Sequence, residues 1–102
     1  MPNPNTLTVS RIELKRILSS YGVAERSMSE VFASMERLHR HVNIIQFINL
    51  LEKAGLGRDR IVNVFRHMGM DDVLIGDALN MADESKINAE TGRLYKATVE
   101  LG

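Results

Sequence analysis

Cysteine is absent from the 102 residues of this chain. Its absence excludes disulfide bridges, thiolate metal ligands and cysteine nucleophiles, and it is typical of a reducing compartment. A chain of this length forms one domain and buries enough surface to fold without cross-links. We therefore expect a single cytoplasmic domain over residues 7–102. Both prolines fall in residues 1–6, which are predicted to form a flexible tail.

Tryptophan is also absent, and aromatic residues make up only 5% of the chain. The apolar residues are mainly Leu, Ile, Val and Met, which is typical of helical packing. No apolar run approaches the ~20 residues that cross a membrane. The first residues, MPNPNT, lack the basic and apolar parts of a signal peptide. We expect no membrane association.

The net charge is zero, which excludes a uniformly basic surface for nucleic acid. The charges are nevertheless unevenly distributed. Residues 1–70 contain ten Lys or Arg against six Asp or Glu, whereas residues 71–102 contain three against seven. Opposite charges of this kind attract each other within one fold or between two copies of it.

Three stretches of the chain share one layout, in which two apolar residues, two polar residues and a variable residue precede a glycine and an apolar residue. They read ILSSYGV, LLEKAGL and VFRHMGM. This layout predicts a Schellman ending, in which glycine takes the left-handed conformation and the next apolar residue packs on the last helical turn. Gly22, Gly55 and Gly69 should therefore each end a helix.

Apolar residues recur at helical spacing between these endings, and residues suited to the first turn of a helix precede each apolar stretch. The helices are predicted to begin near Ser10, Ser27, Asn43, Asp59 and Asp71. The first two have the S-x-x-E spacing of a capping box. At Asn43, the alternative is that the preceding helix runs on. The fold class is therefore mainly α, a compact bundle of about five short helices.

In the last stretch, KINAETGRLYKATVEL, the spacing between apolar residues changes. Residues 95–101 alternate between apolar and polar, which is typical of a half-buried strand. One interpretation is a C-terminal β-hairpin that turns at residues 90–92 and either packs on the helices or pairs with residues 6–9. The other is a final helix. Helices followed by a hairpin would give a winged-helix-like alternative.

Residues 54–72 form a helix–turn–helix in the geometric sense, which raises the hypothesis of a DNA-binding regulator. The candidate nucleic-acid contacts are Arg58, Arg60, Asn63, Arg66 and His67, assisted by Arg37, His39 and Arg40. Two residues argue against this hypothesis. Asp59 adds a negative charge to the segment. Leu51 is a bulky residue four positions before Gly55, where a DNA-reading unit usually has a small residue that lets the helices approach closely. A winged arrangement is opposed by the five carboxylates of residues 71–84, which phosphates would repel.

Sequence signals for catalysis are few. Glu36 and His39 have the E-x-x-H spacing of helical metal ligands, but the second such motif that a di-iron site needs is missing. Neither a G-x-S-x-G motif nor a glycine-rich phosphate loop is present. We expect no enzyme activity, no cofactor, no metal and no small-molecule substrate.

The leading interpretation is a small regulatory or protein-interaction module that binds another protein or itself as a homo-oligomer. Its centre should lie in residues 44–51 and 61–68, because five short helices cannot readily bury so much apolar surface. The candidate interface residues are Ile44, Phe47, Ile48, Leu51, Phe65 and Met68.

Overall fold

A computed structural model of the chain describes residues 6–102, apart from the side chains at positions 93 and 94. Residues 1–5 of the predicted tail lie outside the described residues, and residue 6 already belongs to a strand. The elements in chain order are β1 (Thr6–Val9), α1 (Arg11–Ser20), α2 (Glu25–Arg37), β2 (His41–Asn43), α3 (Ile44–Lys53), α4 (Arg58–His67), α5 (Asp72–Ser85), α6 (Ala89–Leu94) and β3 (Thr98–Leu101). The fold is mostly helical, as predicted, with a small sheet added. Within residues 6–102, the helices lack the length and apolar character that crossing a membrane requires.

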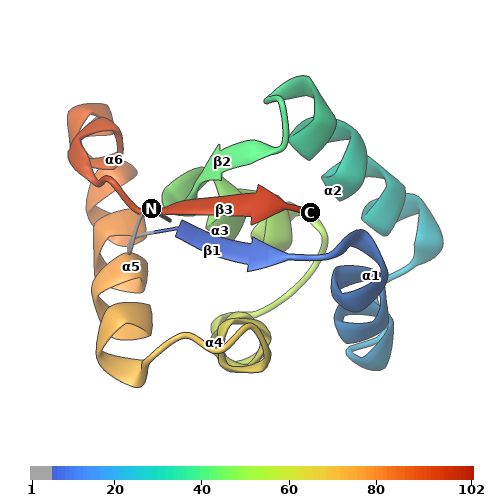
Figure 1. Cartoon of the computed structure of the whole chain (residues 1–102). Helices are drawn as coiled ribbons and strands as arrows, with labels where there is room; N and C mark the ends of the chain where they lie inside the picture. Colours follow the sequence, from blue (N-terminus) through green and yellow to red (C-terminus); the bar gives the residue numbers. More distant parts are fainter. Residues whose placement is uncertain (1–5) are drawn as a thin grey trace.

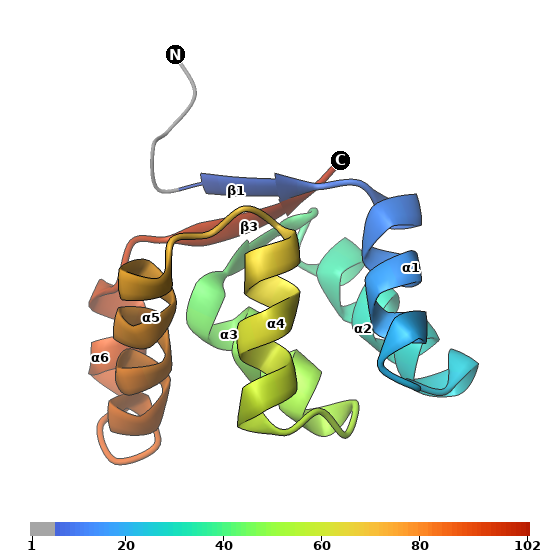
Figure 2. The ribbon, with the colours of Figure 1, turned by 90° about the horizontal axis from the view of Figure 1, so that it is seen from below.

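The three strands form one mixed sheet in the order β1-β3-β2 (Figure 1). The central strand β3 runs parallel to β1 and antiparallel to β2, and Val99 lies opposite Leu7 on one side and Val42 on the other. The helices lie on one side of this sheet (Figure 2). Because side chains alternate across a strand, Val99 and Leu101 are buried against the helices while Thr98 and Glu100 are only partly buried.

Three helices end as the glycine layout predicts. At the end of α3, Gly55 has a φ of +97°, and its N–H and that of Leu56 donate to carbonyls of the last turn at 3.0 and 3.1 Å. This pair of bonds is the Schellman ending, which requires the left-handed conformation that side chains disfavour. Gly22 and Gly69 end α1 and α4 with the same pair of bonds. The predicted ending is therefore confirmed at all three positions.

Side-chain caps begin three helices where the sequence predicts them. The Ser10 hydroxyl, the Asn43 amide oxygen and the Asp71 carboxylate each accept a backbone N–H of the first turn, at 3.1, 2.8 and 2.7 Å. The cap at Asn43 separates α3 from the preceding helix, so the continuous-helix alternative is wrong. The predicted start at Ser27 is also wrong, because α2 begins directly after Ala24 and has no side-chain cap.

The end of α2 uses the same backbone bonds without a glycine. His39 and Arg40 have φ values of +58° and +66°, and their N–H groups donate to carbonyls of the last turn of α2 at 3.0 and 2.9 Å. A side chain in the left-handed conformation costs about 1–2 kcal/mol. The turn between α2 and β2 therefore holds backbone strain.

Replacing His39 by glycine should relieve part of this strain. We expect His39→Gly to raise the free energy of unfolding by about 0.5–1 kcal/mol, because the greater freedom of glycine in the unfolded chain offsets some of the gain. Urea denaturation followed by circular dichroism measures the change. His41→Gly is the matched control, since His41 lies in β2 and the same substitution should destabilise the protein there. Equal losses for both variants would contradict the strain argument.

The core is centred on α3, which packs against α2, α4, α5 and the sheet. Five of its ten residues are buried, which confirms that residues 44–51 form the most apolar and most enclosed segment. Two aromatic rings meet in this core: Phe47 from α3 and Phe65 from α4 lie 5.8 Å apart between ring centres, inclined by 59°. This is the tilted arrangement that aromatic pairs favour.

The C-terminal part forms neither the predicted hairpin nor a single final helix. Residues 90–92, the predicted turn of the hairpin, lie within α6, which Asn88 caps through a 3.1 Å bond from the Glu90 N–H. The strand pattern is confirmed for residues 98–101, and of the pairings left open the one with residues 6–9 is observed. The hairpin is absent because the local cap favours a helical turn where the tight turn was expected.

Candidate functional site

The cations predicted to contact nucleic acid lie on α4, and two of them hold α5. Arg58 Nη2 lies 2.5 Å from Asp83 Oδ1, and Arg66 Nε lies 2.9 Å from Asp72 Oδ1. Both pairs are about half exposed. They join α4 to α5 at two points along the helix and partly neutralise the positive charge that a phosphate backbone would require.

The other predicted contacts point toward α1 or stay within α4. The Arg60 Nη1 donates to the Tyr21 carbonyl at 2.8 Å, and the His67 ring lies 6.2 Å from the Tyr21 ring. Asn63 Oδ1 accepts a 3.5 Å bond from Arg66. The structure therefore divides the five predicted residues between two neighbouring helices and does not bring their cations together on one free surface.

The predicted apolar interface needs correction. Five of its six residues are fully buried in the core: Ile44, Phe47, Ile48, Leu51 and Phe65. Met68 is partly buried and packs against the same core. An interface through the five core residues is wrong for this fold, because α3 and α4 pack against their neighbouring helices and the sheet and leave those side chains no accessible surface.

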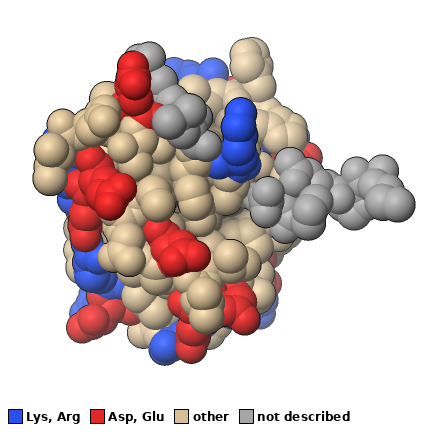
Figure 3. All heavy atoms as spheres, turned by 90° about the vertical axis from the view of Figure 1, so that its left-hand side faces the viewer, with Lys and Arg blue, Asp and Glu red and all other residues tan. Residues whose placement is uncertain are grey.

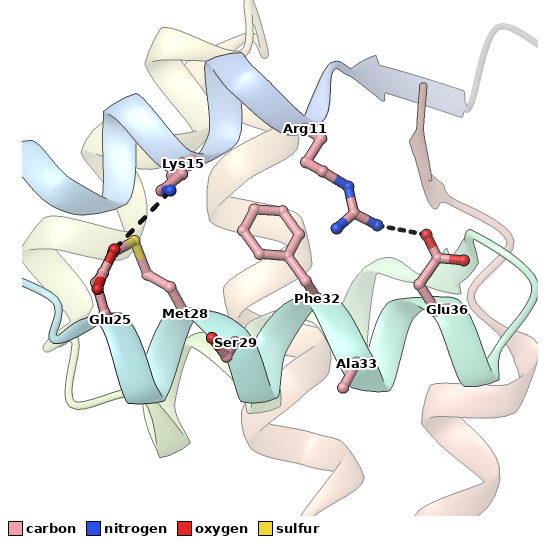
Figure 4. A pocket seen from close by; sticks show the side chains of 8 residues that line it. All are labelled: Arg11, Lys15, Glu25, Met28, Ser29, Phe32, Ala33 and Glu36. Atoms are coloured by element: carbon pink, nitrogen blue, oxygen red, sulfur yellow. Dashed lines mark hydrogen bonds and ion pairs between the residues drawn. The ribbon is translucent and has the colours of Figure 1, made fainter.

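A hollow of about 410 Å³ lies between α1 and α2 (Figure 4). The Arg11 guanidinium lies 5.1 Å from the centre of the Phe32 ring and pairs with Glu36 at 2.5 Å. At the other end, Lys15 lies 3.9 Å from Glu25. These contacts join α1 to α2, and the charges that border the hollow largely satisfy one another.

Glu36 interacts with two arginines in this region. A hydrogen bond from Arg40 and a further bond from Arg11 hold the pKa of the Glu36 carboxyl below its ordinary value, although partial burial opposes them. His39 lies beyond the last residue of α2, so the E-x-x-H pair does not share a helical face. The carboxylate of this motif is thus an ion-pair partner within the fold.

A second groove, of about 450 Å³, lies between the start of α5 and the segments that lead into and out of the sheet. Its lining is mainly apolar and comes from four parts of the chain: Leu7, Ile44, Met70, Leu74, Tyr95 and Ala97. Asp71 and Lys96 add one charge of each sign. We refer to this site as the α5 groove.

Large apolar side chains are exposed at the groove and at the opposite end of α5. Leu74 lines the groove and is 50% exposed, and its neighbour Val73 is 71% exposed. Ile87, just past the end of α5, is 92% exposed. Of the five large apolar side chains that are exposed in the described part of the chain, these three belong to α5 or to the turn after it.

Several acidic side chains lie on the same side of the molecule. Figure 3 shows the side of the molecule that α5 and α6 form, where acidic groups are spread over the surface. Asp77 and Glu84 are exposed on α5. Burial raises the pKa of the Tyr95 phenol and the Asp77 carboxylate raises it further, so the phenol keeps its proton at the groove. The groove is therefore apolar, with Asp71 and Lys96 in its wall and the Asp77 carboxylate near Tyr95.

Sequence reasoning missed the α5 groove, although one signal was present. Val73, Leu74 and Ile75 are consecutive, and three successive residues of a helix cannot all face the same core. The run therefore requires at least one exposed apolar side chain at the start of α5. The other walls come from residues 7 and 95–97, which only the folded sheet brings to this helix.

Comparison with known proteins adds no relationship to these observations: no family model, no curated protein and no solved structure matches this chain.

Proposed function

We propose that this protein is a non-enzymatic interaction module that self-associates, and that its docking surface is the α5 groove with the exposed side chains on its rim. The observation that carries the proposal is the exposure of Val73 and Leu74 beside an apolar groove. Apolar surface gathered at one site is typical of protein contacts, whereas single exposed apolar residues are ordinary. Burial of such side chains favours association.

The polar groups at the groove support binding more than catalysis. The Asp71 carboxylate accepts the Val73 N–H at 2.7 Å and is thus engaged in capping α5. The Tyr95 phenol, with its raised pKa, is a hydrogen-bond donor and a poor proton acceptor. Lys96 is exposed. A proton-transfer pair needs a base and an acid that are free to act, whereas Asp71 caps a helix and Tyr95 holds its proton.

The DNA-binding alternative, including its winged-helix-like form, draws less support. It depends on Arg58, Arg60 and Arg66, each of which has a partner within the chain. These partners also point the three arginines in different directions, Arg60 toward Tyr21 and the other two toward α5. The protein also has no net charge to attract a polyanion over a distance.

Sedimentation equilibrium over a wide range of protein concentration tests the proposal. We expect the mass of the wild-type protein to rise with concentration, and Leu74→Arg to weaken association at least about tenfold, because it removes an apolar contact and places a charge there. Thr8→Arg is the matched control, since it adds the same charge at an exposed position on β1. A wild-type mass that stays monomeric at the highest concentration would overturn the proposal, as would Leu74→Arg associating like the control.

A further inference from the structure

The proposed self-association leaves open which surface of a second copy enters the α5 groove. We infer that it is the outer face of α1, centred on Ile12, so that copies join head to tail. This inference rests on the proposed function and adds the partner surface. It follows from the charge of the groove side, the position of an exposed basic and apolar surface on α1, and the separation of the two surfaces on the molecule.

The α5 side is poorly suited to pair with itself. A two-fold contact would bring the same surface of two copies together, so Asp77 and Glu84 of one copy would face the carboxylates of the other. Like charges brought together at an interface are strongly unfavourable. The occupant of the groove should therefore carry an apolar group surrounded by positive charge.

The outer face of α1 has this character. Ile12 is 82% exposed, so its side chain is free to contact another copy. Lys15 and Arg16 lie three and four residues further along the helix, so their side chains are on the same face as Ile12. The preceding residue, Arg11, is also exposed. Ile12 with Lys15 and Arg16 thus complements an apolar groove that has Asp71 in its wall and Asp77 close to Tyr95.

The existing partners of these cations do not prevent the contact. Lys15 pairs with Glu25 at 3.9 Å, and Arg16 pairs with Glu13, and more than half of each cationic side chain remains accessible. Exposed pairs of this kind contribute little to stability. Exchanging or sharing them with Asp71 and Asp77 of another copy therefore costs little, while Ile12 loses its contact with water.

The two surfaces lie at opposite edges of the molecule. Figures 1 and 2 place α5 and α6 at one edge and α1 at the other. Ile12 consequently cannot reach the groove of its own chain. One contact between two copies leaves a free groove at one end and a free α1 face at the other, so further copies can add and form an open chain or a ring.

Leu38 is the competing candidate, because it is also an exposed apolar residue with basic residues nearby in the sequence, Arg37 directly before it and Arg40 two residues after it. It is only 39% exposed, less than half the exposure of Ile12. It follows the last residue of α2, at the strained turn, whereas Ile12 lies within a regular helix. The same substitution at both positions therefore distinguishes the two surfaces.

Mixing two defective variants tests the inference. Ile12→Gln keeps an intact groove, and Leu74→Arg keeps an intact α1 face. We expect each variant alone to associate at least tenfold more weakly than the wild type. An equimolar mixture should form a one-to-one dimer with wild-type affinity and nothing larger, because one intact contact remains. Light scattering after size-exclusion chromatography measures the masses, and Leu38→Gln should associate like the wild type.

The outcomes separate this inference from the proposed function. If Leu74→Arg is monomeric while Ile12→Gln associates normally, the groove binds another part of the second copy and the head-to-tail inference is overturned alone. A mixture that forms no dimer would show that an intact α1 face does not bind an intact groove, and would overturn the inference equally. Loss of association in Leu38→Gln but not in Ile12→Gln would assign the contact to α2. A monomeric wild-type protein would overturn both proposals.

Discussion

Phe47→Ala is expected to lower the free energy of unfolding by about 3–5 kcal/mol, which is a large part of the roughly 5–15 kcal/mol that stabilises a domain. Phe47 is fully buried on α3 and its ring contacts that of Phe65 on α4. Truncation to alanine loses the free energy gained by burying the ring and the contact between the two rings. It also leaves a cavity, around which the neighbouring side chains lose packing contacts. Because α3 packs on three helices and the sheet, that space cannot be closed by moving one element.

Urea denaturation measures this loss, with Phe47→Leu as the control. Leucine refills most of the volume, so its cost should stay below about 1.5 kcal/mol. A variant with alanine that loses no more than the leucine variant would mean that Phe47 is not at the centre of the core. The sequence also predicts Phe47 as an interface residue, so this measurement distinguishes a role in folding from a role in binding.

Val99→Asp should prevent the protein from folding, with an expected loss of more than about 4 kcal/mol. Val99 is fully buried at the centre of β3, opposite Leu7 and Val42. A carboxylate there would be surrounded by apolar side chains without a cation. Buried charges without partners are among the most destabilising changes that a single substitution can make.

Thr98→Asp is the matched control for this prediction. It introduces the same carboxylate one residue earlier in β3, on the polar face where Thr98 Oγ1 lies 3.1 Å from Thr6 Oγ1. The expected cost is about 1 kcal/mol, for one lost hydroxyl contact. Circular dichroism and thermal unfolding compare the two variants. Similar stability for both variants would contradict the observed register of β3 and the burial of Val99.

Features set by neighbouring residues were predictable from the sequence. The endings at Gly22, Gly55 and Gly69 and the caps at Ser10 and Asp71 depend only on residues within one turn of a helix. They occur where the sequence places them. The prediction for the start of α2 also depended on nearby residues alone, and it was wrong. Ser27 has the capping-box spacing, but the helix begins two residues earlier, at Glu25.

The sheet and the groove depend on contacts that no local pattern describes. β2 has only three residues, too few to show an alternating pattern, and β1 acquires its partner from the other end of the sequence. Without the sheet, the apolar surface of α3 looked like an unpartnered interface. The groove was missed for the same reason, because segments distant in sequence meet only once β3 lies between β1 and β2.

The position of β3 also determines the order in which the fold can be completed. Thr6 and Thr98, neighbours across β1 and β3, are 92 residues apart in the sequence. Neighbouring helices such as α1 and α2 can begin to associate as they leave the ribosome, but both outer strands must wait for the last one. Until then the face of α3 that packs against the sheet is exposed to solvent. Contacts so distant along the chain close slowly, so the pairing of the three strands should be the last step of folding.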